Sequence, residues 1–179
     1  MRRLTPMLAA IFVSLLVPAA SAQAPAPAPA PSWSTFADPD GAFTVDVPQP
    51  PTPSHTDEPQ SDGSKIVTAK YMVDRGAVAM LVEVSHFEGV QLDPAAALDG
   101  AVKGTESEGR TLISDDQIVL AGHPGRSLVL RDGQGNTLTD KMFFFDNALF
   151  QAITVVGKDS PDDDRVMVVR FSGSFRFQQ

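Results

Sequence analysis

Two side chains near the middle of the chain have the types and the spacing of a metal-binding pair. His86 and Glu88 lie two positions apart at the end of an apolar segment, and alternate residues of a strand point to one face. A zinc or other transition-metal site needs a third protein ligand, and no candidate follows nearby in the sequence. The pair is therefore a weak metal-site candidate, and the pattern favours a surface histidine beside a solvated carboxylate.

Nucleophilic catalysis would require a base held beside a serine hydroxyl. The three histidines, His55, His86 and His123, fall in an edge strand or loop, at a strand end and in a turn. The sequence contains no nucleophile elbow, zinc-protease helix, P-loop or dinucleotide-binding glycine motif. We therefore predict no catalytic residue, no cofactor-binding residue and no cofactor.

The acidic clusters are explained without a cation. Asp38, Asp40 and Asp46 resemble part of a calcium loop, but the spacing lacks the closing bidentate glutamate. The run 162–164 is all aspartate and opens a predicted helix, where the dipole favours negative charge. The absence of cysteine from the sequence excludes disulfides and thiolate metal sites. We therefore expect no structural metal. A pair of acids that catalyses glycoside hydrolysis is recognised by the distance between its carboxyl groups, which the sequence does not specify.

The first 22 residues have the pattern of a secretory signal peptide. Arg2 and Arg3 precede an apolar run from Met7 to Ala20, which is shorter than the roughly 20 residues of a membrane-spanning helix. Small residues at the end of this run place the cleavage site after Ala22. Cleavage after Ala24 is an alternative, and the two arginines leave Sec-type and twin-arginine export open.

Residues 23–31 read QAPAPAPAP, which predicts an extended, semi-rigid polyproline linker. Removal of the signal peptide takes out two arginines, so the formal charge changes from 14 − 22 = −8 to 12 − 22 = −10. Such an acidic protein is unsuited to binding nucleic acid or anionic lipid. We expect a soluble protein of the periplasm, or a secreted one, with no stable membrane insertion.

Residues 32–179 are long enough for one globular domain and too short for two ordinary ones. Alternating apolar residues and turn signals predict strands at 43–47, 65–73, 77–87, 117–121, 126–131, 138–146 and 149–156. The proline-rich residues 49–60 fit a sheet edge or a loop. Residues 122–125, Gly-His-Pro-Gly, are interpreted as a turn.

Two helices are predicted between and after these strands. Asp93 is a suitable N-cap for a helix that begins at Pro94. Ser160, with Asp163 three residues later, has the pattern of a capping box for a helix that ends near Gly173. The predicted fold class is therefore α+β: a mainly antiparallel sheet packed with two helices, as an α/β/α-type sandwich.

Turns and core aromatic residues occur in four segments of this domain, WSTFADPDGAFTVDVP, AGHPGRSLVL, FFFDNALFQAITV and VVRFSGSFRF. By these motifs the domain resembles the PsbP-like α/β sandwich domains of small exported bacterial proteins. The resemblance covers roughly Trp33 to Phe177. The resemblance implies a non-catalytic accessory role, as in the extrinsic photosystem II subunit of this type, or a binding module, as in a Ran-binding transport factor. It transfers no functional residue to this chain.

Three hypotheses of function follow. The favoured one is an exported, non-enzymatic accessory or binding module with an envelope protein as its partner. The first alternative is a small periplasmic hydrolase or metal-dependent enzyme. The second is a carrier that holds an apolar ligand between helix and sheet, among Phe143, Phe144 and Phe145. The sequence leaves the oligomeric state open.

Overall fold

The computed structural model describes residues 31–107 and 109–178, apart from the side chains of residues 106 and 107. The predicted signal peptide and all but the last residue of the predicted linker lie outside the described residues. Residues from Pro31 onward form one compact unit. No helix within the described residues is both long enough and apolar enough to cross a membrane.

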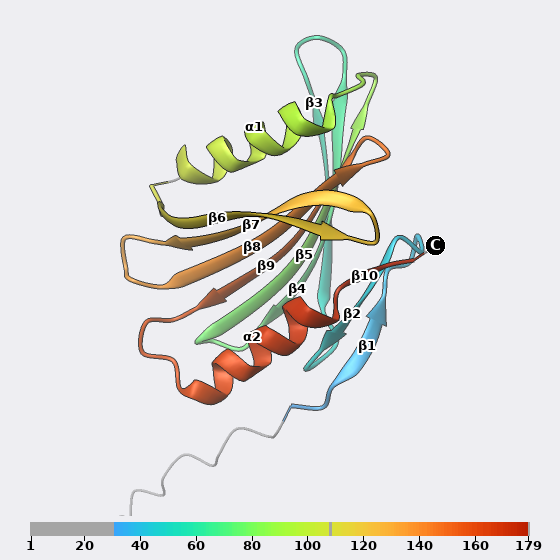
Figure 1. Ribbon diagram of the computed structural model, residues 1–179. Helices are drawn as coiled ribbons and strands as arrows, with labels where there is room; N and C mark the ends of the chain where they lie inside the picture. Colours follow the sequence, from blue (N-terminus) through green and yellow to red (C-terminus); the bar gives the residue numbers. More distant parts are fainter. Residues whose placement is uncertain (1–30, 108, 179) are drawn as a thin grey trace, which may run out of the picture. The chain divides into compact units, whose positions relative to one another are not determined.

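The described residues form ten strands and two helices (Figure 1). Their bounds are β1 Ser34–Ala37, β2 Phe43–Val47, β3 Thr52–Pro59, β4 Lys65–Asp74, β5 Val78–Glu88, α1 Pro94–Ser107, β6 Thr111–Leu120, β7 His123–Arg131, β8 Thr137–Phe145, β9 Ala148–Val156, α2 Asp162–Ser174 and β10 Arg176–Phe177. The large sheet has the order β3-β4-β5-β9-β8-β7-β6, and β1-β2-β10 form a second sheet. All pairings are antiparallel, which confirms the predicted α+β fold class.

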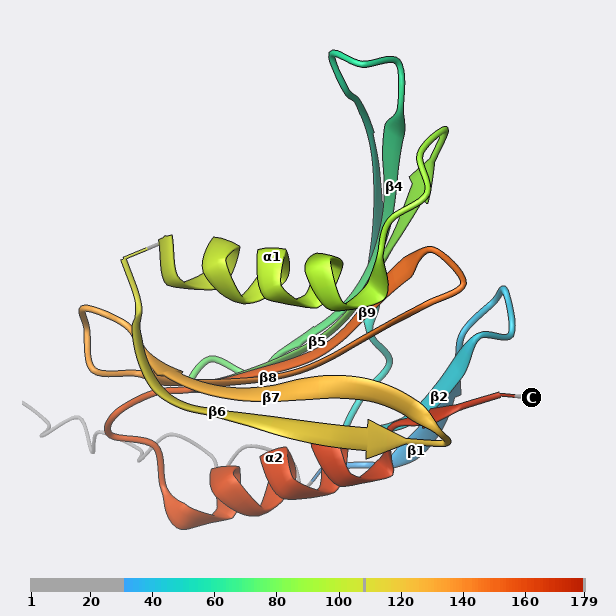
Figure 2. The same cartoon turned by 45° about the horizontal axis from the view of Figure 1, so that its top comes forward.

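Two apolar cores lie on opposite faces of the large sheet, because successive residues of each strand point to opposite sides. One core joins α2 and the small sheet to the large sheet, and Phe43, Phe143 and Phe171 are at most 2% exposed there. The other lies beneath α1, whose Leu98 and Val102 pack near Leu128, Leu130 and Phe144. Figure 2 shows the two helices on opposite sides of the sheet.

Hydrogen bonds of two side chains, Asp93 and Asn147, fix the start of α1. Asp93 caps the helix as predicted, since the Ala96 N–H donates to its Oδ1 at 2.9 Å. Asn147 lies in the β8–β9 turn with a φ of 57°. Its side chain donates to the Val90 carbonyl at 2.7 Å and accepts from the Leu92 N–H at 3.0 Å. The turn therefore holds the segment that leads into α1.

The capping prediction for the second helix is wrong. The N-cap of α2 is Pro161, and no side chain caps it. The Ser160 hydroxyl instead donates to the Ala77 carbonyl at 3.0 Å, which ties the helix start to the β4–β5 turn. The three aspartates do lie in the first turn, where the helix dipole favours them.

One strand prediction and one turn prediction also need correction. The strand predicted at 117–121 is the second half of the longer β6, which contains a register shift between Leu112 and Ser114. The turn predicted at 122–125 is formed instead by Ala121 and Gly122, with φ values of 52° and 86°. Positive φ at both central residues is the type I′ geometry of a two-residue hairpin. His123 therefore begins β7.

Candidate functional site

A groove separates α1 from the hairpin of β6 and β7. The helix packs over β7 and β8, so β6 extends beyond it as the last strand of the sheet. The groove has a volume of about 850 Å³. Its apolar walls include Leu98 of α1 and Ile118, Val119 and Pro124 of the hairpin. Val119 is 71% exposed, which is unusual for a valine in a regular strand and marks this wall as available for contact.

Arg126 crosses the floor of this groove and binds carboxylates on both sides. Its Nε donates to Asp115 Oδ1 at 2.7 Å, its Nη2 contacts the other oxygen of Asp115, and its Nη1 donates to Asp99 at 3.1 Å. The hydrogen bond with Asp115 is the largest cause that raises the pKa of Arg126. Arg126 thus joins β7 to β6 and α1, and its charge is already matched within the protein.

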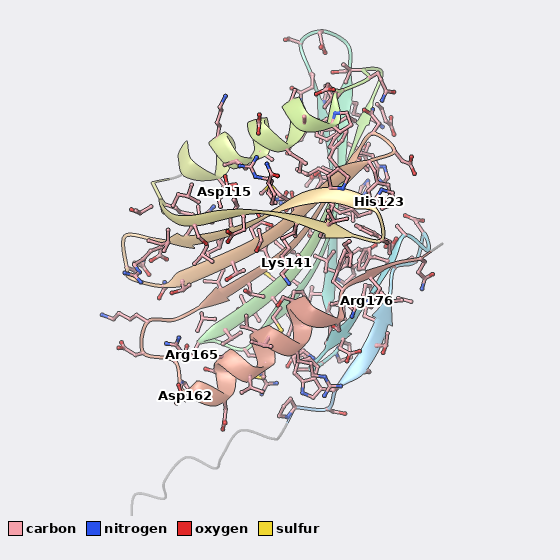
Figure 3. All side chains as sticks on the ribbon, in the orientation of Figure 1. Asp115, His123, Lys141, Asp162, Arg165 and Arg176 are labelled. Carbon is pink, nitrogen blue, oxygen red and sulfur yellow. The ribbon has the colours of Figure 1, made fainter. Side chains whose placement is uncertain are left out.

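The border of the groove is consequently acidic. Asp93 and Asp99 lie on the α1 side of the groove, and Asp115 on β6 pairs with Arg126, so three carboxylates accompany one guanidinium. Asp116, the next residue of β6, lies on the opposite face of the strand. Figure 3 shows Asp115 on β6 on the side of the sheet that α1 covers. Asp116 is exposed and forms no ion pair with the described residues. An excess of negative charge gives this border a negative potential.

A second, smaller pocket lies on the other face of the same strand. It has a volume of about 230 Å³ and is lined by Ile118 and Leu120 of β6 and by Phe143 and Phe175. Its two cations, Lys141 and Arg176, are both labelled in Figure 3. Lys141 donates to the Ser172 carbonyl at 3.3 Å and Arg176 to the Gly173 carbonyl at 2.8 Å. Both therefore interact with the negative C-terminal end of α2.

The predicted pair His86 and Glu88 lies on one face of β5, but the two side chains have different neighbours. Glu88 forms an ion pair with Lys65 at 3.1 Å. His86 is exposed and borders a cavity of about 210 Å³ that also has His55, Asp38 and Asp40 in its wall. His55 Nε2 contacts Asp57 at 2.8 Å. Among the described residues, no three histidine or acidic side chains converge as metal ligands.

The carboxylates considered for calcium have protein partners instead. Asp38 accepts from the Tyr71 hydroxyl at 2.9 Å and from the Ala42 N–H at 3.1 Å. Burial, followed by the hydrogen bond to Asp38, raises the pKa of Tyr71 to about 12. Asp46 accepts from Arg170 of α2, whose guanidinium also stacks over Trp33 at 4.3 Å. Asp38 and Asp46 therefore link the small sheet and its turn to β4 and α2.

The remaining histidine and the three consecutive phenylalanines are packing residues. His123 stacks on Phe145 with 3.8 Å between ring centroids. Phe143 and Phe144 belong to the two cores on opposite faces of the sheet, so the three rings do not line one common cavity. Among the described residues, no hydrogen bond joins a serine side chain to a histidine.

Asp140 is a buried acid that the sequence reasoning missed. It lies on β8 and is 1% exposed. Its Oδ2 accepts from Gln151 at 2.7 Å, while its Oδ1 has no hydrogen-bond partner. Burial raises the pKa of Asp140 to about 7. The signal was present in the alternation of β8, since Asp140 falls on the same face as the apolar Leu138 and Met142.

Comparison with known proteins defines the fold class. No family model matches the chain. No curated protein matches it either. The structure is similar to the solution structure of cyanobacterial PsbP (CyanoP) from Synechocystis sp. PCC 6803, with a TM-score of 0.52 and 12% identity. The similarity covers 87% of this chain and 98% of that chain. The fold is therefore PsbP-like, as the sequence predicted. At 12% identity the similarity shows a shared fold and does not show a shared function.

Proposed function

We propose that this protein is an exported accessory module of the bacterial envelope that binds a partner protein through the face formed by α1 and β6. The observation that carries the proposal is the open groove between these elements, with Leu98 and Val119 on its walls. Exposed apolar surface with a polar rim is typical of protein-binding sites. The export pattern at the N-terminus and the PsbP-like fold support an accessory role.

The charge of the groove defines the class of partner. Its carboxylates outnumber its single arginine, and the chain beyond residue 22 has a formal charge of −10 by sequence, 12 − 22. A basic surface would associate faster with such a face, and salt would weaken the association over distances of about 10 Å at 0.1 M. The partner is therefore a protein with a basic, partly apolar surface.

Site-specific cross-linking tests the proposal. A photoreactive residue in place of Val119 should give a discrete adduct in envelope extract at low salt, and much less at high salt. The matched control places the same residue at Thr56 on the opposite edge strand β3, where we expect no such adduct. Adducts that are equal at the two positions would refute binding through this face.

The enzyme alternative is tested on the same preparation. A panel of hydrolase substrates should show no turnover by the purified protein. Turnover that disappears in either His86→Ala or His123→Ala, while the fold is retained, would replace the binding module with an enzyme.

A further inference from the structure

We infer that the partner binds as an added β-strand along Gln117–Leu120 of β6, an inference that rests on the proposed function. The occupant is an extended segment of a basic protein with apolar side chains and a Lys or Arg opposite Asp116. Figure 2 shows that this edge runs between α1 on one side of the sheet and α2 on the other, so both flanks of an added strand would meet protein.

The hairpin turn fixes which backbone groups face outward. The turn Leu120-Ala121-Gly122-His123 is type I′, so Leu120 and His123 form a hydrogen-bonded pair. Hydrogen-bonded and non-hydrogen-bonded pairs alternate along an antiparallel ladder. Val119, opposite Pro124, and Gln117, opposite Arg126, therefore direct their N–H and C=O groups away from β7. Pro124 agrees with this assignment because it has no N–H to donate to Val119.

The two edges of the large sheet are protected to different degrees. β3 contains Pro53 and Pro59 and is exposed along its whole length, so prolines interrupt its outer edge. β6 has its register shift in the first half, near Ile113, and no proline or lysine anywhere. Its second half is regular and paired with β7 up to the turn. This half is the part of the sheet that is open to strand addition.

Pockets on both faces of β6 match the alternation of an added strand. Residues opposite Val119 and Gln117 would point into the groove beside α1, which contains Leu98. Residues opposite Ile118 and Leu120 would point toward the smaller pocket that contains Phe143 and Phe175. Strand addition obtains affinity from main-chain hydrogen bonds and specificity from such alternating pockets. Apolar side chains on both faces of the partner segment are therefore favoured.

Charge selects a different protein over a second copy of this chain. Asp116 is exposed on the face away from α1, and β6 itself, TLISDDQIVL, contains no basic residue. A second copy paired through β6 would bring no cation to Asp116 from that strand. A partner segment with a Lys or Arg at this position would supply an opposite charge across the pair, a contact that stabilises sheets.

A labelled synthetic peptide tests the mode of binding. In an antiparallel arrangement, Val-Ile-Val-Thr-Lys places its lysine opposite Asp116 and its isoleucine opposite Val119. N-methylation of the isoleucine or threonine amide removes an N–H that faces β6, whereas N-methylation of the central valine modifies one that faces away. We expect the first two changes to weaken binding at least about tenfold and the third by less than about threefold, measured by fluorescence anisotropy.

Protein variants test the same edge from the other side. Val119→Pro removes an outward N–H without a bond to β7, and should weaken peptide binding at least about tenfold. Val119→Thr keeps the N–H and is the matched control. Gln117→Pro gives a second test at the other outward position if Val119→Pro does not fold. Asp116→Lys should weaken the lysine peptide and favour one that ends in glutamate.

The outcomes separate this inference from the proposed function. Equal sensitivity to all three N-methylations, or full binding by both proline variants, would overturn strand addition. A dimer in sedimentation that Val119→Pro dissociates would assign the edge to a second copy and would also overturn it. A third outcome is that Gln117→Pro no longer binds the peptide but still gives the cross-linked adduct at Val119. The groove would then bind its partner in another way, and the proposed function would stand without strand addition.

Discussion

Replacement of Asp140 by asparagine should change how the stability of the protein depends on pH. The wild-type carboxyl is buried in the folded protein, where Gln151 donates a hydrogen bond to it. Asparagine has nearly the same shape and retains an oxygen that accepts from Gln151, but it does not ionise. The substitution therefore removes the titration of one buried acid and leaves the packing close to that of the wild type.

The magnitude follows from the pKa of Asp140. Burial raises this pKa to about 7 in the folded protein, from 3.8 for an aspartate in water. Between these values the unfolded chain releases the proton and the folded protein keeps it, so wild-type stability falls as the pH rises. At about 1.4 kcal/mol per pH unit, the loss from pH 4 to pH 8 reaches about 4 kcal/mol. Below about pH 3 and above about pH 8 this contribution is nearly constant.

Urea unfolding of both proteins at pH 4, 5.5, 7 and 8 measures the effect. The free energy of unfolding of Asp140→Asn minus that of the wild type should increase steadily from pH 4 to pH 7 and then level off. All other titrating groups cancel in this difference. Asp116→Asn, an exposed acid on β6, is the matched control and should follow the wild type. Parallel curves for Asp140→Asn and the wild type would show that the pKa of Asp140 is not raised by folding.

Four further predictions concern the fold. Gly125→Ala should destabilise the domain by about 1–3 kcal/mol in urea, since an added Cβ would overlap the neighbouring strand β8; an unchanged midpoint would contradict this. Ser160→Ala should cost about 1 kcal/mol without loss of helical circular dichroism, because the hydroxyl bonds Ala77 and caps nothing. Ultraviolet titration should show Tyr71, held by Asp38, half ionised near pH 12 in the folded protein and near pH 10 in urea. EDTA should leave the melting temperature unchanged, and restoration of a lowered value by zinc or calcium would contradict the metal-free interpretation.

Local sequence patterns predicted the elements well where local chemistry decides the outcome. Asp93 followed by Pro94 identified the start of α1, because the cap and the helix are adjacent in sequence. The prolines of residues 49–60 restricted this segment to a sheet edge or a loop, since proline cannot donate to a ladder, and the structure shows the edge strand β3. Ser160 was misinterpreted because a contact with Ala77, far away in sequence, competes with the local cap.

Features that depend on strand order were beyond local patterns. His123 lies among turn-like residues in the sequence, but in the structure it begins β7 and stacks on Phe145, and the turn is formed by the two preceding residues. The free edge of β6 depends on which strands pair, and the sequence does not specify that order. The groove and the outward backbone of Val119 could therefore not be predicted. Asp140 was within reach, because its place in an apolar row of β8 follows from alternation alone.

The short strand β10 pairs with β2, which lies near the other end of the described domain. Phe177 pairs with Phe43 of β2, and the Gln178 N–H donates to the Ala42 carbonyl at 3.0 Å. The small sheet is therefore complete only when residues 176–178 pair with β2, and closing so long a loop adds an entropic cost. Without β10, β2 would become an edge strand whose outer backbone groups have no partner in the small sheet.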